Sequence, residues 1–172
     1  ARLVDEEAST AHPAPSAAQI AAGNYQKGHI KIGPLDLSIE NPVGSTRSGT
    51  ENGKAWETTM QAHYGYVKRT EGADGDQVDV FVRAGTASDH KGPVYVVDQA
   101  NPKTGRFDEH KAMIGYGSAA EAARAYDAHF GDKSGPKRRK AVVAMPMADF
   151  NNWARNGDTS QPISRAAQEA DA

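Results

Sequence analysis

The 172-residue chain contains no cysteine, which excludes disulfide bonds and thiolate metal sites. It also lacks an apolar run of membrane-spanning length and a recognisable signal peptide, so a membrane partner is not expected. An excess of one charge is missing as well, because 20 Lys and Arg stand against 22 Asp and Glu, for a net charge of −2. This balance argues against a general nucleic-acid binder.

The sequence also lacks the patterns of a zinc site and of a nucleotide P-loop, and it has only a short basic run. The six His are dispersed and show no paired spacing of zinc ligands. The Gly-rich stretch 44–49, GSTRSG, lacks the GK[ST] ending of a nucleotide P-loop. The basic run 137–140 follows Gly-Pro, and we interpret it as a solvated loop, with contact to phosphate or nucleic acid as the alternative.

The most informative stretch that is present is 74–80, DGDQVDV, which places three carboxylates within six residues at the start of an expected strand. Asp74, Asp76 and Asp79 repel one another unless a cation or solvent offsets the repulsion. Mg²⁺ takes oxygen ligands and usually binds through one or two carboxylates together with substrate phosphate. Asp and Gly are also ordinary turn residues, so a solvated acidic turn is the alternative.

Residues 63–82, HYGYVKRTEGADGDQVDVFV, resemble the signature segment of the soluble, Mg²⁺-dependent inorganic pyrophosphatases, a family of single-domain β-barrels. In that family a Tyr-Gly-Tyr strand precedes Asp-Gly-Asp-Pro-apolar-Asp-apolar. The separation agrees, since the first Tyr lies ten residues before the first Asp, as Tyr64 does before Asp74 (74 − 64 = 10). Gln77 stands where the family usually has Pro, a position that shapes the loop.

Downstream, residues 107–114 resemble the second site strand of the family. A metal-binding acid precedes a phosphate-binding Lys by two positions there, and Glu109 and Lys111 match that spacing. Alternation puts their side chains on one face of a strand. Thr104 stands where the family has another Asp. A surface ion pair is the alternative for Glu109 and Lys111.

Upstream, residues 37–40 resemble the strand that supplies a further carboxylate, with Glu40 in that role and Ser38 where the family has Lys. Arg47 lies in the following loop and corresponds to the Arg that grips phosphate. The family also ends a helix with a Tyr-Lys pair, which the segment 129–133, HFGDK, does not offer.

The resemblance implies that metal ions activate the attacking water and neutralise the charge of the substrate. Fixed cationic side chains then stabilise the leaving phosphate. Asp76 is then the catalytic general base. The implied phosphate-binding residues are Arg47, Tyr64 and Lys111, and the implied metal ligands are Asp74, Asp79, Glu109 and Glu40. The implied cofactor is Mg²⁺, with Mn²⁺ as a substitute. For Tyr64, a place in the core of a strand is the alternative.

The pattern of strands and turns predicts an α+β fold, which the resemblance implies to be a small, mainly antiparallel β-barrel with one or two C-terminal helices. Expected strands lie at 29–39, 55–60, 63–68, 77–83, 93–98, 106–114 and 141–145, and expected helices at 118–130 and 147–155. Ser118 is the expected N-cap of the first helix.

We interpret residues 1–23 as a linker-like N-terminal segment, 24–156 as a pyrophosphatase-like domain and 157–172 as a polar tail. With a first residue other than Met, the chain resembles diverged modules in large polyproteins of phages and mobile elements. It would then act in the cytoplasm, or travel with the virion and be delivered to the host cytoplasm. Both a larger parent polypeptide and a homo-oligomer remain open.

The sequence therefore predicts Mg²⁺-dependent hydrolysis of inorganic pyrophosphate to phosphate. One alternative is a catalytically degenerate module that keeps this fold for a structural or interaction role in a phage-derived polyprotein. The other is hydrolysis of a nucleotide phosphoanhydride at the same metal site.

Overall fold

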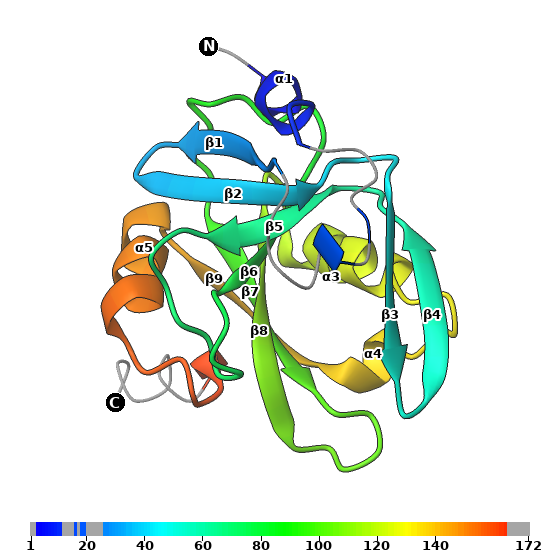
Figure 1. Cartoon of the computed structure of the whole chain (residues 1–172). Helices are drawn as coiled ribbons and strands as arrows, with labels where there is room; N and C mark the ends of the chain where they lie inside the picture. Colours follow the sequence, from blue (N-terminus) through cyan, green and yellow to red (C-terminus); the bar gives the residue numbers. More distant parts are fainter. Residues whose placement is uncertain (1–2, 12–15, 17, 20–25, 165–172) are drawn as a thin grey trace, which may run out of the picture.

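The computed structural model describes residues 3–11, 16, 18–19 and 26–164, and its centre is a mixed sheet covered by helices (Figure 1). A small two-stranded sheet stands apart from the central one. In chain order the elements are α1 (Val4–Ala8), β1 (Gly28–Ile32), β2 (Leu35–Asn41), β3 (Thr46–Glu51), β4 (Lys54–Thr59), β5 (His63–Val67), β6 (Asp79–Val82), β7 (Val94–Ala100), β8 (Phe107–Ile114), α3 (Ala119–Ala128), α4 (Gly135–Arg138), β9 (Arg139–Met145) and α5 (Met147–Asn156).

The central sheet has seven strands in the order β1-β2-β5-β6-β8-β7-β9, and β3 pairs only with β4 among the described strands. Neighbours in the central sheet are antiparallel except β6 and β8, which are parallel and place Asp79 directly beside Lys111. The sheet stays open, with β1 and β9 as its two edges, so the predicted closure into a barrel is wrong. The α+β class and the mainly antiparallel sheet are confirmed.

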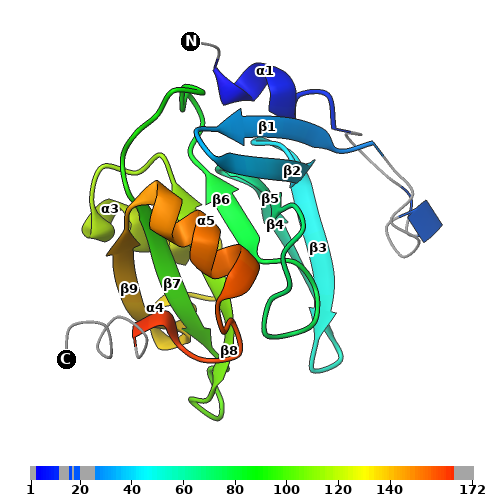
Figure 2. The same cartoon turned by 90° about the vertical axis from the view of Figure 1, so that its left-hand side faces the viewer.

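Apolar side chains fill both faces of the central sheet, which explains why helices cover it on each side. On one face β-strand residues pack with Val4 and Ala8 of α1 and with Phe150 and Ala154 of α5. Figure 2 shows α5 lying across this face. On the other face Tyr126 of α3 joins the second core, in which Tyr64 and Phe81 also lie.

Local sequence signals explain most element boundaries. Ser118 caps α3 as predicted, because its hydroxyl accepts a hydrogen bond from the Glu121 N–H at 3.1 Å. The expected strand at 29–39 is two strands, since Gly33 turns the chain with φ +55° between β1 and β2. The stretch 46–51, which was expected to be a loop, forms β3.

Parts of both end segments pack on the sheet. Val4 and Ala8 are buried, and Ile163 beyond α5 is buried as well. Asp98 holds this last segment by accepting hydrogen bonds from the backbone N–H groups of Ile163 (2.7 Å) and Ser164 (3.1 Å). The domain boundaries themselves stay predictions. In the part of the chain that the structure describes, helices are too short or too polar to cross a membrane.

Candidate active site

Lys111 is the centre of the candidate site. Its ammonium group donates to the Tyr64 hydroxyl at 2.8 Å and to Asp79 Oδ2 at 2.6 Å, and it lies 2.7 Å from Glu109 Oε1. Burial alone would lower the pKa of Lys111, but the attraction of Tyr64, Asp79 and Glu109 outweighs burial and holds that pKa well above its ordinary value. Lys111 is therefore a permanent buried cation, and the surface ion pair considered for it is excluded.

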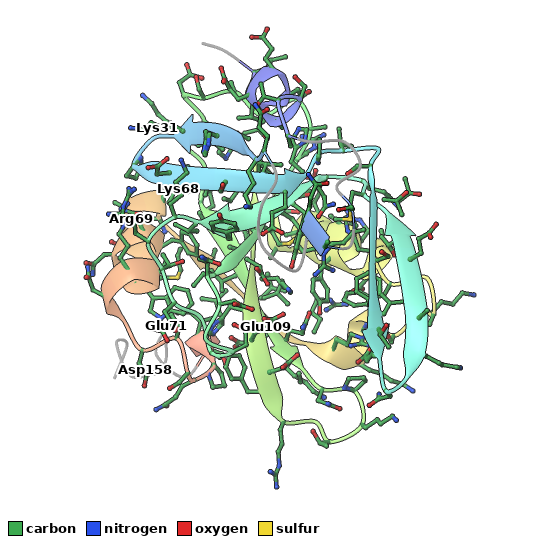
Figure 3. All side chains as sticks on the ribbon, in the orientation of Figure 1. Lys31, Lys68, Arg69, Glu71, Glu109 and Asp158 are labelled. Atoms are coloured by element: carbon green, nitrogen blue, oxygen red, sulfur yellow. The ribbon has the colours of Figure 1, made fainter. Side chains whose placement is uncertain are left out.

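Glu109 is a largely buried acid with other carboxylates close to it. Burial raises its pKa from about 4.5 to about 7, and Asp79 and a hydrogen bond with Asp74 add to the increase, although Lys111 opposes it. The structure thus brings Glu109 together with two of the three acids of the 74–80 stretch, Asp74 and Asp79. Figure 3 shows Glu109 beside β8, apart from the labelled cations Lys31, Lys68 and Arg69.

The acidic stretch forms the expected turn. Asp74 Oδ1 accepts a hydrogen bond from the backbone N–H of Asp76 at 3.0 Å, and Gly75 has φ +87°, which favours glycine. The Thr70 hydroxyl anchors the far end of the turn by accepting from the Val78 N–H at 3.0 Å. Asp76 is exposed at the tip of this turn. The turn holds Asp74 toward Glu109 and leaves Asp76 facing solvent.

A cavity of about 520 Å³ opens beside Lys111. Four of the eight predicted site residues line it, namely Arg47, Tyr64, Glu109 and Lys111. Asp79 joins this group through its contact with Lys111, and Asp74 through Glu109.

Arg47 reaches the cavity from β3. Its guanidinium group lies 4.4 Å from the ring centroid of Tyr64 and 5.0 Å from that of Trp56 on β4. Alternate residues of the β3–β4 hairpin share one face, and Arg47, Trp56 and Thr58 of that face line the cavity. The hairpin therefore forms one wall of the cavity and presents Arg47 from a strand, where the sequence predicted a loop.

In the structure Glu40 lies outside the group of site residues around Lys111. It is half-buried on β2, at an irregularity of the pairing with β5 where Asn41 opposes Tyr64, and it does not line the cavity. Within the described ranges, moreover, no three His, Cys, Asp or Glu side chains are grouped closely enough to hold a metal ion. Asp74, Asp79 and Glu109 still carry the carboxylate oxygens that a hard divalent cation takes as ligands, with Lys111 between Asp79 and Glu109.

Sequence reasoning missed Gln99, which orients the acidic residues of β8. Its amide Nε2 donates to Asp108 Oδ2 at 3.2 Å and to Glu109 Oε1 at 3.4 Å, while its Oε1 accepts from the buried Tyr126 hydroxyl at 2.6 Å. The signal was the polar pair Asp98 and Gln99 at the end of an otherwise apolar strand. Buried polar side chains at such a place need partners, and here the partners belong to the site.

His129 was set aside as a dispersed histidine but also lines the cavity. Its Nε2 accepts from the Gln61 N–H at 3.1 Å, so Nδ1 carries the proton that is donated to the Ala125 carbonyl at 2.8 Å. Burial lowers the pKa of His129, and Arg47 lowers it further, against the hydrogen bond with Ala125. With one ring nitrogen accepting and the other donating, His129 is a neutral imidazole in the cavity wall.

The buried lysine, its carboxylate partners and the adjoining cavity define a hydrolase-like site on an α+β scaffold. The chain belongs to the inorganic pyrophosphatase family, because the family model described as Inorganic Pyrophosphatase matches residues 17–155. A solved structure described as an inorganic phosphatase from Anaplasma phagocytophilum is similar at 14% identity and a TM-score of 0.37, covering 82% of this chain and 94% of the other. The chain matches none of the curated proteins.

Proposed function

We propose that this chain hydrolyses inorganic pyrophosphate to two phosphates with the help of Mg²⁺, for which Mn²⁺ can substitute. The single observation that carries the proposal is the buried Lys111 ammonium held between Asp79 and Glu109 at the edge of a cavity that Arg47 also lines. A phosphoanhydride needs such fixed positive charge next to carboxylates that can hold a metal ion. Membership of the inorganic pyrophosphatase family supports this choice of substrate.

Asp74, Asp79 and Glu109 would hold the metal, whereas Glu40, which lies outside this group, would have to move to contribute. Burial is the main cause of the raised pKa of Glu109, and the further increase from Asp79 and Asp74 supports this assignment, because it means that the three carboxylates lie close together. When bound, a divalent cation would lower the pKa of a coordinated water and offset substrate charge. Thr104, Ser38 and Gln77, where the family has other residues, are not part of the proposed ligand set.

The phosphate groups would be held by Lys111 and Arg47, which carry permanent charge in the cavity wall. Tyr64 would position the Lys111 ammonium through the 2.8 Å hydrogen bond between them. Asp76 would take the proton from the attacking water as general base. Its exposed place on the turn leaves it free to accept that proton.

A second candidate is hydrolysis of a nucleotide phosphoanhydride at the same site. The cavity of about 520 Å³ favours it, since pockets for drug-sized organic ligands span roughly 300–1,000 Å³. Trp56 and Phe130 add aromatic surface to the wall, which a bare pyrophosphate does not need. The degenerate module of a phage-derived polyprotein is a third possibility, favoured by the finding that no three His, Cys, Asp or Glu side chains of the described residues are grouped closely enough to hold a metal ion.

The deciding experiment measures phosphate release from pyrophosphate by the purified chain, with and without Mg²⁺ and with ATP as a competing substrate. Mg²⁺-dependent release that ATP does not reduce supports the pyrophosphatase. Faster release from ATP supports the second candidate. No release above the background of Asp76→Asn contradicts both and leaves the degenerate module.

The Asp76→Asn variant should lower kcat by about a hundredfold or more, because it removes a base and keeps the shape of the turn. Its Mg²⁺ affinity, measured by calorimetry, should stay close to that of the unmodified chain. Asp79→Ala should instead weaken Mg²⁺ binding directly. Asp149→Asn, on the first turn of α5, is the matched acid-to-amide control and should change neither quantity.

An equal loss of Mg²⁺ affinity in Asp76→Asn would contradict its assignment as the base. Full activity of Asp79→Ala would show that the central metal ligand has been misassigned.

A further inference from the structure

Arg138 belongs to the basic run that was interpreted as a solvated loop, yet its side chain lines the same cavity as Arg47 and Lys111. Only 11% of that side chain is exposed. It ends α4, the short helix Gly135–Arg138 that follows α3. The structure thus buries a third guanidinium or ammonium group at the site.

Several contacts hold Arg138 in this position. Its Nε donates to the Ser134 hydroxyl at 2.8 Å, and its guanidinium lies 5.0 Å from the ring centroid of Phe130. Its two terminal nitrogens donate to both oxygens of Glu51, at 3.2 and 3.0 Å. Ser134 and Phe130 therefore fix the stem and plane of Arg138, while Glu51 accepts hydrogen bonds from its two terminal nitrogens.

Glu51 is a weakly held partner for these donors. It ends β3 at the tip of the hairpin, and 44% of its side chain is exposed, so water can solvate it when the pair opens. Gly131, which also lines the cavity, has open space where a side chain would otherwise stand. A tetrahedral oxyanion can take the place of the Glu51 carboxylate on the same two donors, since guanidinium binds carboxylate and phosphate with similar forked geometry.

The balance of charges in the cavity wall favours displacement of the Glu51 carboxylate by a phosphate group. The lining residues include three cations, Arg47, Lys111 and Arg138, and Lys111 is engaged by Asp79 and Glu109. They also include five acids, namely Glu51, Glu57, Asp108, Glu109 and Asp132. A multiply charged phosphate that enters such a wall gains most where a cation can be freed from an acidic partner.

We propose that Arg138 is a third phosphate-binding residue of this site. In the absence of substrate, Glu51 pairs with its guanidinium group, and a phosphate group displaces the Glu51 carboxylate. The inference rests on the proposed function for the identity of the ligand. It assigns Arg138 as a residue that contacts substrate and Glu51 as a competitor for that contact.

The test compares Arg138→Gln and Glu51→Gln, which break the same ion pair from opposite sides. The readouts are KM and kcat for pyrophosphate, and the Kd of methylenediphosphonate, a non-hydrolysable diphosphonate, measured by calorimetry with Mg²⁺. Arg138→Gln should weaken diphosphonate binding by about tenfold or more, as expected for a lost hydrogen bond between charged groups. Glu51→Gln should tighten it by about two- to fivefold, because the guanidinium no longer has to leave a charged partner.

The double variant separates release of Arg138 from a general loss of negative charge. In the Arg138→Gln background, Glu51→Gln should give no further gain, since it acts through Arg138. Arg139→Gln is the matched control. Arg139 is the next residue and forms a similar forked pair with Asp127, at 3.0 and 2.8 Å, but it does not line the cavity. Its variant should leave Kd unchanged.

Weaker diphosphonate binding by Arg138→Gln together with tighter binding by Glu51→Gln supports the proposal. Weaker binding by both variants would show that the ion pair only stabilises the position of the hairpin. An equal gain from Glu51→Gln with and without Arg138 would overturn the proposal as well. If Arg138→Gln does not fold, Arg138→Lys keeps the charge without the fork and should weaken binding by a smaller factor. Diphosphonate binding that depends on Arg138 without hydrolysis of pyrophosphate would refute the proposed function and keep this inference. Hydrolysis with no effect of Arg138→Gln would do the reverse.

Discussion

At the scale of single residues, the site depends on charges that are buried together. Lys111, Asp79 and Glu109 come from two motifs that the sequence already singled out, and their spacing predicted that Glu109 and Lys111 share a face of one strand. What spacing alone did not indicate was the depth of burial. A lysine with 9% of its side chain exposed stays charged only because carboxylates surround it.

Gly65, between the two tyrosines, shows how one residue controls the packing around the site. A Cβ at this position would overlap the Ser38 carbonyl oxygen of the neighbouring strand and come within 2.8 Å of the Ile39 Cα. Both are backbone atoms and cannot rotate away. Gly65→Ala should therefore force β2 and β5 apart and lower the free energy of unfolding by about 3 kcal/mol.

Urea denaturation measures this change, and Gly131→Ala is the control because a Cβ there meets no atom within 4 Å. The control should be close to neutral. If Gly65→Ala were as stable as the control, the close approach of β2 and β5 would not exist as described.

At the scale of elements, the β3–β4 hairpin is the part that sequence patterns predicted least well. The stretch 46–51, TRSGTE, has no apolar alternation, because its side chains belong to neither core cluster and Arg47, Thr50 and Glu51 line the cavity instead. Strand patterns identify residues that pack in a core. A strand whose inward residues face a cavity does not carry that pattern, so Arg47 was assigned to a loop.

The segment after α5 makes a second element-scale prediction, because Asp98 on β7 holds it. Burial by itself would raise the pKa of Asp98, but His110 and the N–H groups of Ile163 and Ser164 outweigh burial and hold the pKa below 3.8. Asp98→Asn should therefore lower the free energy of unfolding by about 2 kcal/mol at neutral pH, since it weakens hydrogen bonds to a charged group.

The difference in the free energy of unfolding between the unmodified chain and Asp98→Asn should become smaller as the pH falls. A depressed carboxyl pKa stabilises the fold above the unfolded-state pKa near 3.8, and this contribution is lost as the pH falls through the lower folded-state pKa. The gap between wild type and Asp98→Asn should thus close in acid, as denaturant titrations at several pH values would show. Asp158→Asn is the control on the same segment, since its hydrogen bonds stay local to Ser160 and Gln161. A gap that widens in acid would contradict this account.

At the scale of the whole molecule, the parallel pair β6–β8 creates the site. It pairs the end of the 74–80 stretch directly with residues 107–114, although β7 separates them in the sequence, and it places Asp79 beside Lys111. Asp79 and Lys111, 32 residues apart in the sequence, meet only because the sheet order inserts β8 between β6 and β7. Residues of the β3–β4 hairpin and Arg138 of α4 complete the lining of the cavity.

If Mg²⁺ binds between these elements, it should stabilise the folded state as a whole. A ligand at a hundredfold excess over its Kd adds about 2.7 kcal/mol, which corresponds to a rise in Tm of about 5–10 °C for a chain of this length. Differential scanning fluorimetry with Mg²⁺, compared with EDTA and with NaCl at equal ionic strength, measures this shift. Asp79→Ala should abolish it. A shift of the same size in NaCl would show general screening and count against a bound metal ion.

The sequence by itself determined which residues carry charge at the site, the turn around Gly75, the cap of α3 and most strands, because these depend on neighbours a few residues away. The resemblance of residues 63–82 extended this to the inorganic pyrophosphatase family, which the family match confirms. Only the tertiary structure decided that the sheet stays open, that Glu40 stands apart from the cavity and that Gln99 and Arg138 border it. Those outcomes depend on which distant strands pair and on what burial does to a charge, and neither is expressed in local spacing.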